Sequence, residues 1–480
     1  MRIFTHEPLS RPRGHGATAA RLAAGRPGGL KSLLRSSSLA VGARVAGAVL
    51  GICAQILLAR ILSAEDLGNF FVALSLATVL ATVSTLGYPW IVPMILARAD
   101  AAGRPHRAAA FLAWARRDIG VVSAGLAVVA ILGIWLVPSF SIHTRWVLTA
   151  GAATAPVFAL MRFNGPVANA RRKFALGYLP DLFWRPLFLL GLIVALWALF
   201  GRFDVTGLLL GHLAITIALA AEMARRLNAA DGTGDGVATA PGRLGPGRRG
   251  QGRRWRARAL PMVVATLFIG VFADLDLLIA GSILNETETG IFGVCIKISM
   301  FLAFSIQAVH QVMVRDVANA LQSRDRSALT AILFKANQTN LLVSLGAVAG
   351  VYWLARHFLA LFGPEFVDGG LSLLLLAAAQ AIRAAAGPAT QILALTGHVR
   401  ATLPVFAAGL ALLFATNLAL VPLYGLTGAA LAVLIVTAVW SMGLSLLAKA
   451  RTGLDVAIFR LPQLSALSGA KVGGSVQGGR

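Results

Sequence analysis

Six basic side chains fall inside long apolar stretches of the sequence: Arg44, Arg60, Arg162, Arg185, Lys297 and Arg383. A charge surrounded by hydrocarbon is costly, so such residues usually face a protein interior or a water-filled cavity. Arg60 lies near the end of its stretch, from where its side chain can extend to the membrane surface. The other five are candidates for one shared chemistry, the binding of an anion.

A guanidinium presents paired donors that match the oxygens of a phosphate, which makes arginine suited to a pyrophosphate or an acidic sugar. We therefore predict that such a ligand contacts Arg44, Arg162, Arg185, Lys297 and Arg383. The alternative for each residue is a structural role, in which its side chain is bonded to backbone carbonyls or to a neighbouring acid.

Acidic residues lie at a comparable depth in the apolar stretches. Asp181 and Arg185 are four residues apart, so on a helix they can form a structural pair. Asp274 and Asp276 are two residues apart and cannot face the same way. Asp274 either takes part in proton or Na⁺ coupling or neutralises Lys297 on the next stretch. We expect no metal site, because no His, Cys and Asp cluster has the spacing of metal ligands.

The composition indicates which elements position these residues. Of the 480 residues, 57% are hydrophobic and only 13% are charged, and the mean hydropathy is +0.77. Soluble proteins have about 45–50% apolar and about 25% charged residues. This chain has more apolar surface than a water-soluble core hides, so we expect a polytopic membrane protein. A soluble enzyme, a secreted module and a DNA-binding protein are close to excluded.

Twelve stretches are long and apolar enough to cross a membrane as helices: 38–62, 69–97, 119–138, 146–168, 176–200, 205–224, 259–283, 291–313, 338–362, 370–396, 401–421 and 425–448. Between them, Lys and Arg gather in alternate connections. The other connections, which include 355–369 with the overlapping end of the 338–362 stretch, contain only Arg145, Arg202 and Arg356. Because cytoplasmic loops are enriched in Lys and Arg, both termini are predicted to be cytoplasmic. Topology thus explains much of the net charge of +24, and we expect no nucleic-acid partner.

The longest connection divides the twelve predicted spans into two sets of six. The predicted segments are a disordered basic cytoplasmic N-terminus over 1–37, an N-lobe over 38–227, a disordered Arg/Gly-rich cytoplasmic linker over 228–258, a C-lobe over 259–450 and a cytoplasmic tail over 451–480. A Gly-rich, Arg-rich connection of this kind is typical of a linker that lies near an anionic membrane surface.

An internal repeat relates the two halves. Gly68 and Gly290 are 222 positions apart, and so are Pro166 and Pro388, each of which follows a glycine. An even number of spans in each half gives parallel repeats about an axis along the membrane normal. This architecture places a substrate site between the lobes, and the two matched prolines are candidate bend points.

Four segments together resemble one family of membrane proteins: LLARILSAEDLGNF from Leu57, DLLIAGSILNETETGIFG from Asp276, FGPEF from Phe362 and LTGHVR from Leu395. They resemble the polysaccharide-biosynthesis flippases of the multidrug/oligosaccharidyl-lipid/polysaccharide exporter superfamily, over roughly residues 37–450. The resemblance implies an all-α fold of about twelve transmembrane helices, in which two six-helix bundles form a V around a central cavity.

The resemblance also implies a function. Such flippases move an undecaprenyl-pyrophosphate-linked oligosaccharide from the cytoplasmic to the periplasmic leaflet of the bacterial inner membrane, before polymerisation into O-antigen, capsule or exopolysaccharide. The implied partners are the lipid-linked oligosaccharide and membrane lipids, with polysaccharide polymerase and chain-length proteins as further ones. We expect no enzymatic activity and no cofactor.

Two other classes of function stay open. A membrane-bound polysaccharide polymerase or ligase needs a catalytic platform outside the bilayer, whereas the outward connections are short and lack paired-carboxylate or nucleotide-phosphate motifs. A multidrug exporter of the same superfamily needs an acidic, aromatic-lined cavity, which the basic excess inside the spans opposes. An exporter for another lipid carrier is the alternative that the residues oppose least.

Overall fold

The computed structural model describes residues 29–201, 203–229, 246–322, 326–454 and 456, and all regular secondary structure among them is helical. The first half contains α2 (Gly29–Ile61), α3 (Ala64–Ser84), α4 (Tyr88–Ala101), α5 (Pro105–Leu136), α6 (Ile142–Ala170), α7 (Phe174–Leu179), α8 (Arg185–Phe200) and α9 (Val205–Ala229). The second half contains α10 (Pro246–Ala259), α11 (Met262–Gly281), α12 (Glu286–Gln322), α13 (Arg326–Ala360), α14 (Gly370–Ala385), α15 (Ala389–Leu395) and α16 (Leu403–Thr452).

The predicted membrane protein with twelve spans in two lobes is confirmed. Nine helices of the described residues are long and apolar enough to cross a membrane. One of them, α16, contains two spans, because Gly425 has a non-helical backbone and Gly428 packs against the backbone of Leu420. Helices α2 and α12 cover the two other predicted stretches, 38–62 and 291–313.

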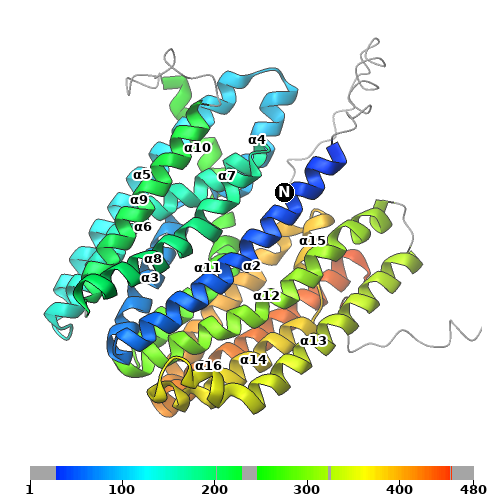
Figure 1. Cartoon of the computed structure of the whole chain (residues 1–480). Helices are drawn as coiled ribbons and strands as arrows, with labels where there is room; N and C mark the ends of the chain where they lie inside the picture. Colours follow the sequence, from blue (N-terminus) through cyan, green and yellow to red (C-terminus); the bar gives the residue numbers. More distant parts are fainter. Residues whose placement is uncertain (1–28, 202, 230–245, 323–325, 455, 457–480) are drawn as a thin grey trace, which may run out of the picture.

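The two lobes meet at one end of the molecule and diverge toward the other, where α2 lies between them (Figure 1). The shared end, at the lower left of Figure 1, contains the turns with Glu65, Asp66, Asp204, Glu286 and Glu288. We call it the acidic end. The opposite end contains the Lys- and Arg-rich turns around Arg104, Arg172 and Arg225, and we call it the basic end.

The segments outside the spans differ from the sequence-based expectation. Residues 1–28, 230–245 and 457–480 lie outside the described residues. The prediction of disorder is wrong for residues 29–37, where α2 has already begun, and for residues 246–258, which belong to α10. The reason for the second error is tertiary packing, which a composition rich in Arg and Gly does not reveal.

Helix α10 is held on the N-lobe by contacts with α4 and α5. The carboxylate of Asp118, which is buried, accepts hydrogen bonds from the hydroxyl of Tyr88 at 2.8 Å and from the Arg256 guanidinium. This carboxylate raises the pKa of Arg256 further above its ordinary value. The ring of Trp255 packs edge-on against Phe111, with 5.3 Å between the ring centroids.

Arg256→Gln is expected to release α10 from the N-lobe. The substitution removes a charge-assisted bond to a buried carboxylate, which costs about 2 kcal/mol. Hydrogen exchange and trypsin cleavage within residues 246–259 should therefore increase. Arg254→Gln removes the same charge from an exposed position on the same helix and is the matched control. Equal protection of α10 in both variants would show that the Asp118 contact does not hold it.

The repeat predicted from an offset of 222 extends to the helix boundaries. Helix α3 begins at Ala64 and α12 at Glu286, and both starts have the same cap. Ser63 Oγ accepts the backbone N–H of Asp66 at 3.1 Å, and Asn285 Oδ1 accepts that of Glu288 at 2.7 Å. An acidic residue three positions after a capping residue is the signature of a helix start.

The two candidate bend points differ between the lobes. Pro388 lies in the break between α14 and α15, next to Gly387, whose φ of +76° only glycine adopts without strain. Pro166 instead lies inside α6, which is continuous from Ile142 to Ala170. Of these two matched positions, only the one in the C-lobe interrupts a helix.

Candidate functional site

The lobes meet along a seam formed by equivalent faces of α3 and α12. The spacing of four, three and four residues places the seam positions on one side of each helix. We define the interlobe seam by its eight residues: Ala64, Gly68, Phe71 and Ser75 on α3, and Glu286, Gly290, Gly293 and Lys297 on α12. Each position on α3 is the repeat equivalent of one on α12, so the seam has a pseudo-two-fold axis.

Two glycines allow the backbones of α3 and α12 to touch. A Cβ on Gly68 would lie less than 3.0 Å from the Glu286 carbonyl oxygen, and one on Gly290 would lie equally close to that of Ala64. These two clashes are related by the repeat, since Ala64 and Glu286 are equivalent positions. Small residues permit such approach between membrane helices. The sequence marked both glycines as repeat landmarks but did not predict that they contact each other.

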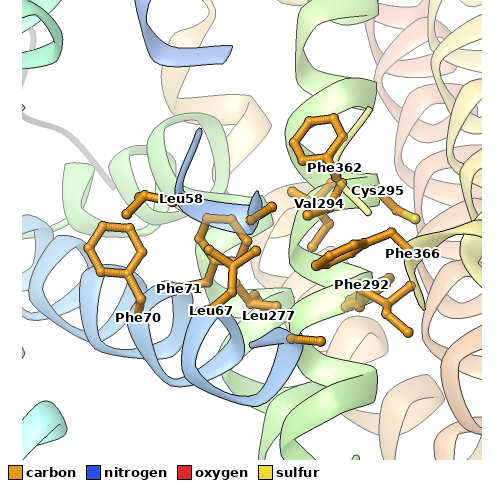
Figure 2. Packing of buried hydrophobic residues seen from close by; sticks show 14 of the residues in the cluster. Leu58, Leu67, Phe70, Phe71, Leu277, Phe292, Val294, Cys295, Phe362 and Phe366 are labelled. Atoms are coloured by element: carbon orange, nitrogen blue, oxygen red, sulfur yellow. The ribbon is translucent and has the colours of Figure 1, made fainter. Parts of the chain in front are cut away.

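An apolar cluster closes the acidic end around the seam. Figure 2 shows side chains of both lobes in it, including Leu67 and Phe71 of the N-lobe and Phe292 and Phe366 of the C-lobe, all four fully buried. The ring of Phe71 packs directly against Gly293, so a Cβ at this position would collide with the ring. The cluster excludes water from the acidic end.

Polar groups also connect the lobes at this end. Arg60 donates to the carbonyl oxygens of Ala360 and Leu361 at the end of α13, at 2.7 and 2.8 Å. Thr144 of α6 donates to the Glu286 carboxylate at 3.0 Å. Arg60 therefore has a defined partner in the other lobe, rather than only the extension toward the membrane surface that the sequence suggested.

Carboxyl groups of the two lobes also lie near each other at this end, and the neighbouring Glu286 raises the pKa of the Glu65 carboxyl above its ordinary value. Two negative charges close together repel each other, so a proton on Glu65 removes a repulsion between the lobes. The closed acidic end should thus be most stable at low pH and should loosen as the pH rises and Glu65 loses this proton.

Raising the pH is expected to lengthen the distance between spin labels on Ser139→Cys of the N-lobe and Thr287→Cys of the C-lobe. Both positions are exposed at the acidic end, and Cys53→Ala removes the exposed native thiol. Glu65→Gln should keep the short distance at high pH, because an amide carries no charge to repel Glu286. Glu288→Gln is the matched control and should behave as the parent protein. A distance independent of pH in the parent would contradict this repulsion between the lobes.

Further from the acidic end, charged side chains gather where α3, α6 and α11 meet. Ser75 donates to Asp274 of α11 at 3.1 Å, across the two lobes. Arg162 of α6 donates to the hydroxyl of Thr82 on α3. The guanidinium of Arg162 also experiences the charges of Asp181, Arg185 and Asp274, so predicted residues far apart in the chain lie in one electrostatic cluster.

The pair of Asp181 and Arg185 lies at a π-helical turn. Asp181 Oδ1 and Arg185 Nη2 are 3.0 Å apart, at the spacing that the sequence suggested for a structural pair. The Arg185 guanidinium lies 4.8 Å from the centroid of the Phe158 ring on α6. Pro180 begins the π-helical turn Pro180–Trp184, and such turns occur often at functional sites.

The remaining predicted residues have separate surroundings. Lys297 Nζ lies 5.8 Å from the Phe71 ring centroid of the other lobe, while Asp274 bonds to Ser75, so the described contacts do not join these two charges. Arg383 has no hydrogen-bond or ion-pair partner among the described residues. Arg44 lies on α2, but its side chain is outside the described part of the structure.

The second acidic residue of α11 has a structural environment. Asp276 is fully buried and accepts a hydrogen bond from Asn417 of α16 at 2.9 Å, within the C-lobe. Asp274 and Asp276 thus face different neighbours, as their separation by two residues predicts. Across the described residues, no three His, Cys, Asp or Glu side chains lie close enough together to bind a metal ion.

The fold can now be compared with known proteins. No family model matches the sequence, and no curated protein matches it. Solved structures do match: the lipid II flippase MurJ in an inward closed conformation has a TM-score of 0.65 at 14% identity, covering 86% of this chain and 87% of that one. The chain has the fold of a MOP-superfamily transporter. An inward-facing multidrug resistance MATE family transporter of this superfamily has a TM-score of 0.64 at 14% identity, covering 88% of this chain and 96% of that one.

The comparison also bears on conformation. An outward-facing MATE family transporter has a TM-score of 0.53 at 15% identity, covering 94% of this chain and 98% of that one. This TM-score is lower than that of the inward-facing MATE structure. The fold that the resemblance to polysaccharide-biosynthesis flippases implied is confirmed, since the matched structures are MOP transporters.

Proposed function

We propose that this protein is a flippase for an undecaprenyl-pyrophosphate-linked oligosaccharide, which it moves from the cytoplasmic to the periplasmic leaflet of the bacterial inner membrane. The observation that carries the proposal is the set of basic side chains on membrane helices of both lobes. Arg162 lies in the cluster of α3, α6 and α11, and Lys297 lies at the inner end of the seam. Arg383 has no described partner for its charge.

Charge balance favours an anionic ligand over a cationic drug. Asp181 pairs with Arg185, and Asp276 is hydrogen-bonded within the C-lobe. Asp274 is then the remaining carboxylate beside Arg162, while Lys297 and Arg383 lack a described acidic partner. A pyrophosphate would neutralise this surplus, and guanidinium groups fit its oxygens. A multidrug exporter for cations would need the opposite balance.

In this proposal the basic end is cytoplasmic and both termini lie on that side, as the distribution of Lys and Arg favours. The lobes closed at the acidic end would then expose the cationic residues toward the cytoplasmic leaflet, where the lipid-linked substrate is made. Opening the seam and closing the basic end would present the ligand to the other leaflet by alternating access. Polymerase and chain-length proteins would act on the product, in synthesis of O-antigen, capsule or exopolysaccharide.

Deleting the gene and extracting lipid-linked intermediates tests the proposal. The expected result is a complete oligosaccharide unit trapped on the cytoplasmic leaflet. A truncated unit would indicate a glycosyltransferase, and a complete unit on the outer leaflet would indicate a polymerase or ligase. Unchanged intermediates together with increased sensitivity to cationic drugs would indicate a multidrug exporter. Any of these three outcomes would overturn the proposal.

A further inference from the structure

A large apolar pocket lies in the N-lobe, away from the interlobe seam. It has a volume of about 1200 Å³. It opens between two walls, one formed by α7 and the start of α8 and the other by the half of α9 that lies nearer the basic end. Its wall is formed mainly by hydrocarbon and aromatic side chains, among them Pro180, Trp184, Phe188, Ile215, Ala218 and Leu219. No part of the proposed transport cycle uses this pocket.

The wall of the pocket faces the hydrocarbon of the membrane. Of the residues in the most apolar part of the span Phe174–Phe200, only 6% are buried inside the protein, so much of the surface of this segment is available to lipid. Trp184 and Phe188 remain 39% and 43% exposed, and their rings stack with 5.7 Å between centroids. An apolar pocket open to lipid is filled by a lipid chain rather than by water.

The rim of the pocket at the basic end carries an excess of positive charge. Four basic side chains line it, Arg172, Lys173, Arg225 and Arg226, and Glu222 is the one acidic residue in the lining. Glu222 is already paired with both Arg225 and Arg226. The charges of Arg172 and Lys173 therefore remain without a described carboxylate partner.

The backbone presents one of these charges in an uncommon conformation. Arg172 has a φ of 60°, in the left-handed region that a non-glycine residue rarely adopts. This conformation ends α6, where the backbone N–H of Lys173 donates to the carbonyl of Ala168, and it sets the direction in which the chain enters the turn that lines the pocket. The Lys173 ammonium donates to the backbone carbonyl of Arg226 at 3.4 Å, which joins the α6–α7 turn to the end of α9 above the pocket.

We propose that this pocket binds an anionic phospholipid of the membrane, with an acyl chain between α8 and α9 and its phosphate on the basic rim. Charge complementarity selects an anionic head group, since the rim has three net positive charges. A lipid-linked oligosaccharide fits less well, because the wall offers few polar groups to hydrogen-bond sugar hydroxyls. The site is thus distinct from the proposed substrate site and does not depend on it.

Native mass spectrometry of the full-length protein, with dioleoyl phosphatidylglycerol or dioleoyl phosphatidylcholine added, tests the proposal. The expected result is one retained phosphatidylglycerol with clear preference over phosphatidylcholine. Arg172→Gln combined with Lys173→Gln should weaken retention of phosphatidylglycerol about 25-fold, about fivefold for each removed charge. Arg104→Gln with Arg107→Gln removes two exposed charges at the same end, outside the pocket, and should have no such effect.

A second variant tests the binding of the lipid acyl chain rather than that of the head group. Ala218→Trp should fill the pocket and reduce retention of either lipid, whereas Ala124→Trp on the exposed face of α5 should not. Equal retention of the two lipids by the parent protein would overturn the proposal. Unchanged phosphatidylglycerol retention in the Arg172 and Lys173 double variant, or in Ala218→Trp, would overturn it as well.

Discussion

Gly68→Ala is expected to force the lobes apart at the acidic end and to lower transport at least about tenfold. The new Cβ would lie 2.9 Å from the backbone nitrogen of Gly290 and closer still to the carbonyl oxygen of Glu286. Both atoms belong to the backbone, so no side-chain rotation relieves the overlap. Gly290→Ala should have the same effect, since it meets the Ala64 carbonyl in the same way.

The sign of this effect distinguishes a clash at the seam from a change in helix propensity, because the two act in opposite directions. Replacing glycine by alanine inside an exposed helix normally stabilises it by about 0.5–1 kcal/mol. Gly120→Ala on α5, where a Cβ meets nothing within 4 Å, is the matched control and should preserve transport. The label pair on residues 139 and 287 should show a longer distance in Gly68→Ala and in Gly290→Ala, but not in Gly120→Ala. If Gly68→Ala keeps the parent distance, the contact of α3 with α12 does not set the closed state.

Replacing Arg162 and Arg383 together by Gln is expected to abolish flipping while the protein remains folded. Each residue is proposed to form a charge-assisted bond with the phosphate groups, and losing two such bonds lowers transport by about 100-fold or more. Transport is measured as the fraction of lipid-linked oligosaccharide that reaches the outer leaflet in cells with equal amounts of each protein.

The surface pair Arg104→Gln and Arg107→Gln again serves as the control, because it removes the same net charge at exposed positions. Normal flipping in this pair, together with loss in the Arg162 and Arg383 pair, would assign the effect to position rather than to total charge. Intact transport in the Arg162 and Arg383 double variant at a normal protein level would show that these residues do not bind the substrate.

The sequence predicted the spans well because membrane insertion depends on a local property. A stretch of about 20 apolar residues must form a helix in hydrocarbon, whatever its neighbours are. The position of the helical hairpin in α16 and the repeat spacing followed from the same local pattern. Helix α10 was missed because its stability depends on Trp255 and Arg256 meeting residues of α5, more than a hundred positions earlier.

The candidate site was harder to predict, because its contacts cross between lobes. Asp274 could be matched from the sequence with Lys297, a charge on the next span, yet its described partner is the hydroxyl of Ser75. The stripe of Ala64, Gly68, Phe71 and Ser75 on one face of α3 could have indicated the contact with α12, because the repeat brings equivalent stripes together. It does not indicate the contact with α11, since the offset pairs Ser75 with Lys297 rather than with Asp274.

The seam has the geometry of a homodimer interface within a single chain. An isologous contact places the same patch of two copies face to face, as the Gly68 and Gly290 pair does here. At such a contact a substitution normally appears twice, once on each side of the axis. Because one chain contains both copies, the two sides can carry different residues. Ser75 is equivalent to Lys297, so a hydroxyl in one copy corresponds to a charge in the other, and asymmetric chemistry is available beside a symmetric contact.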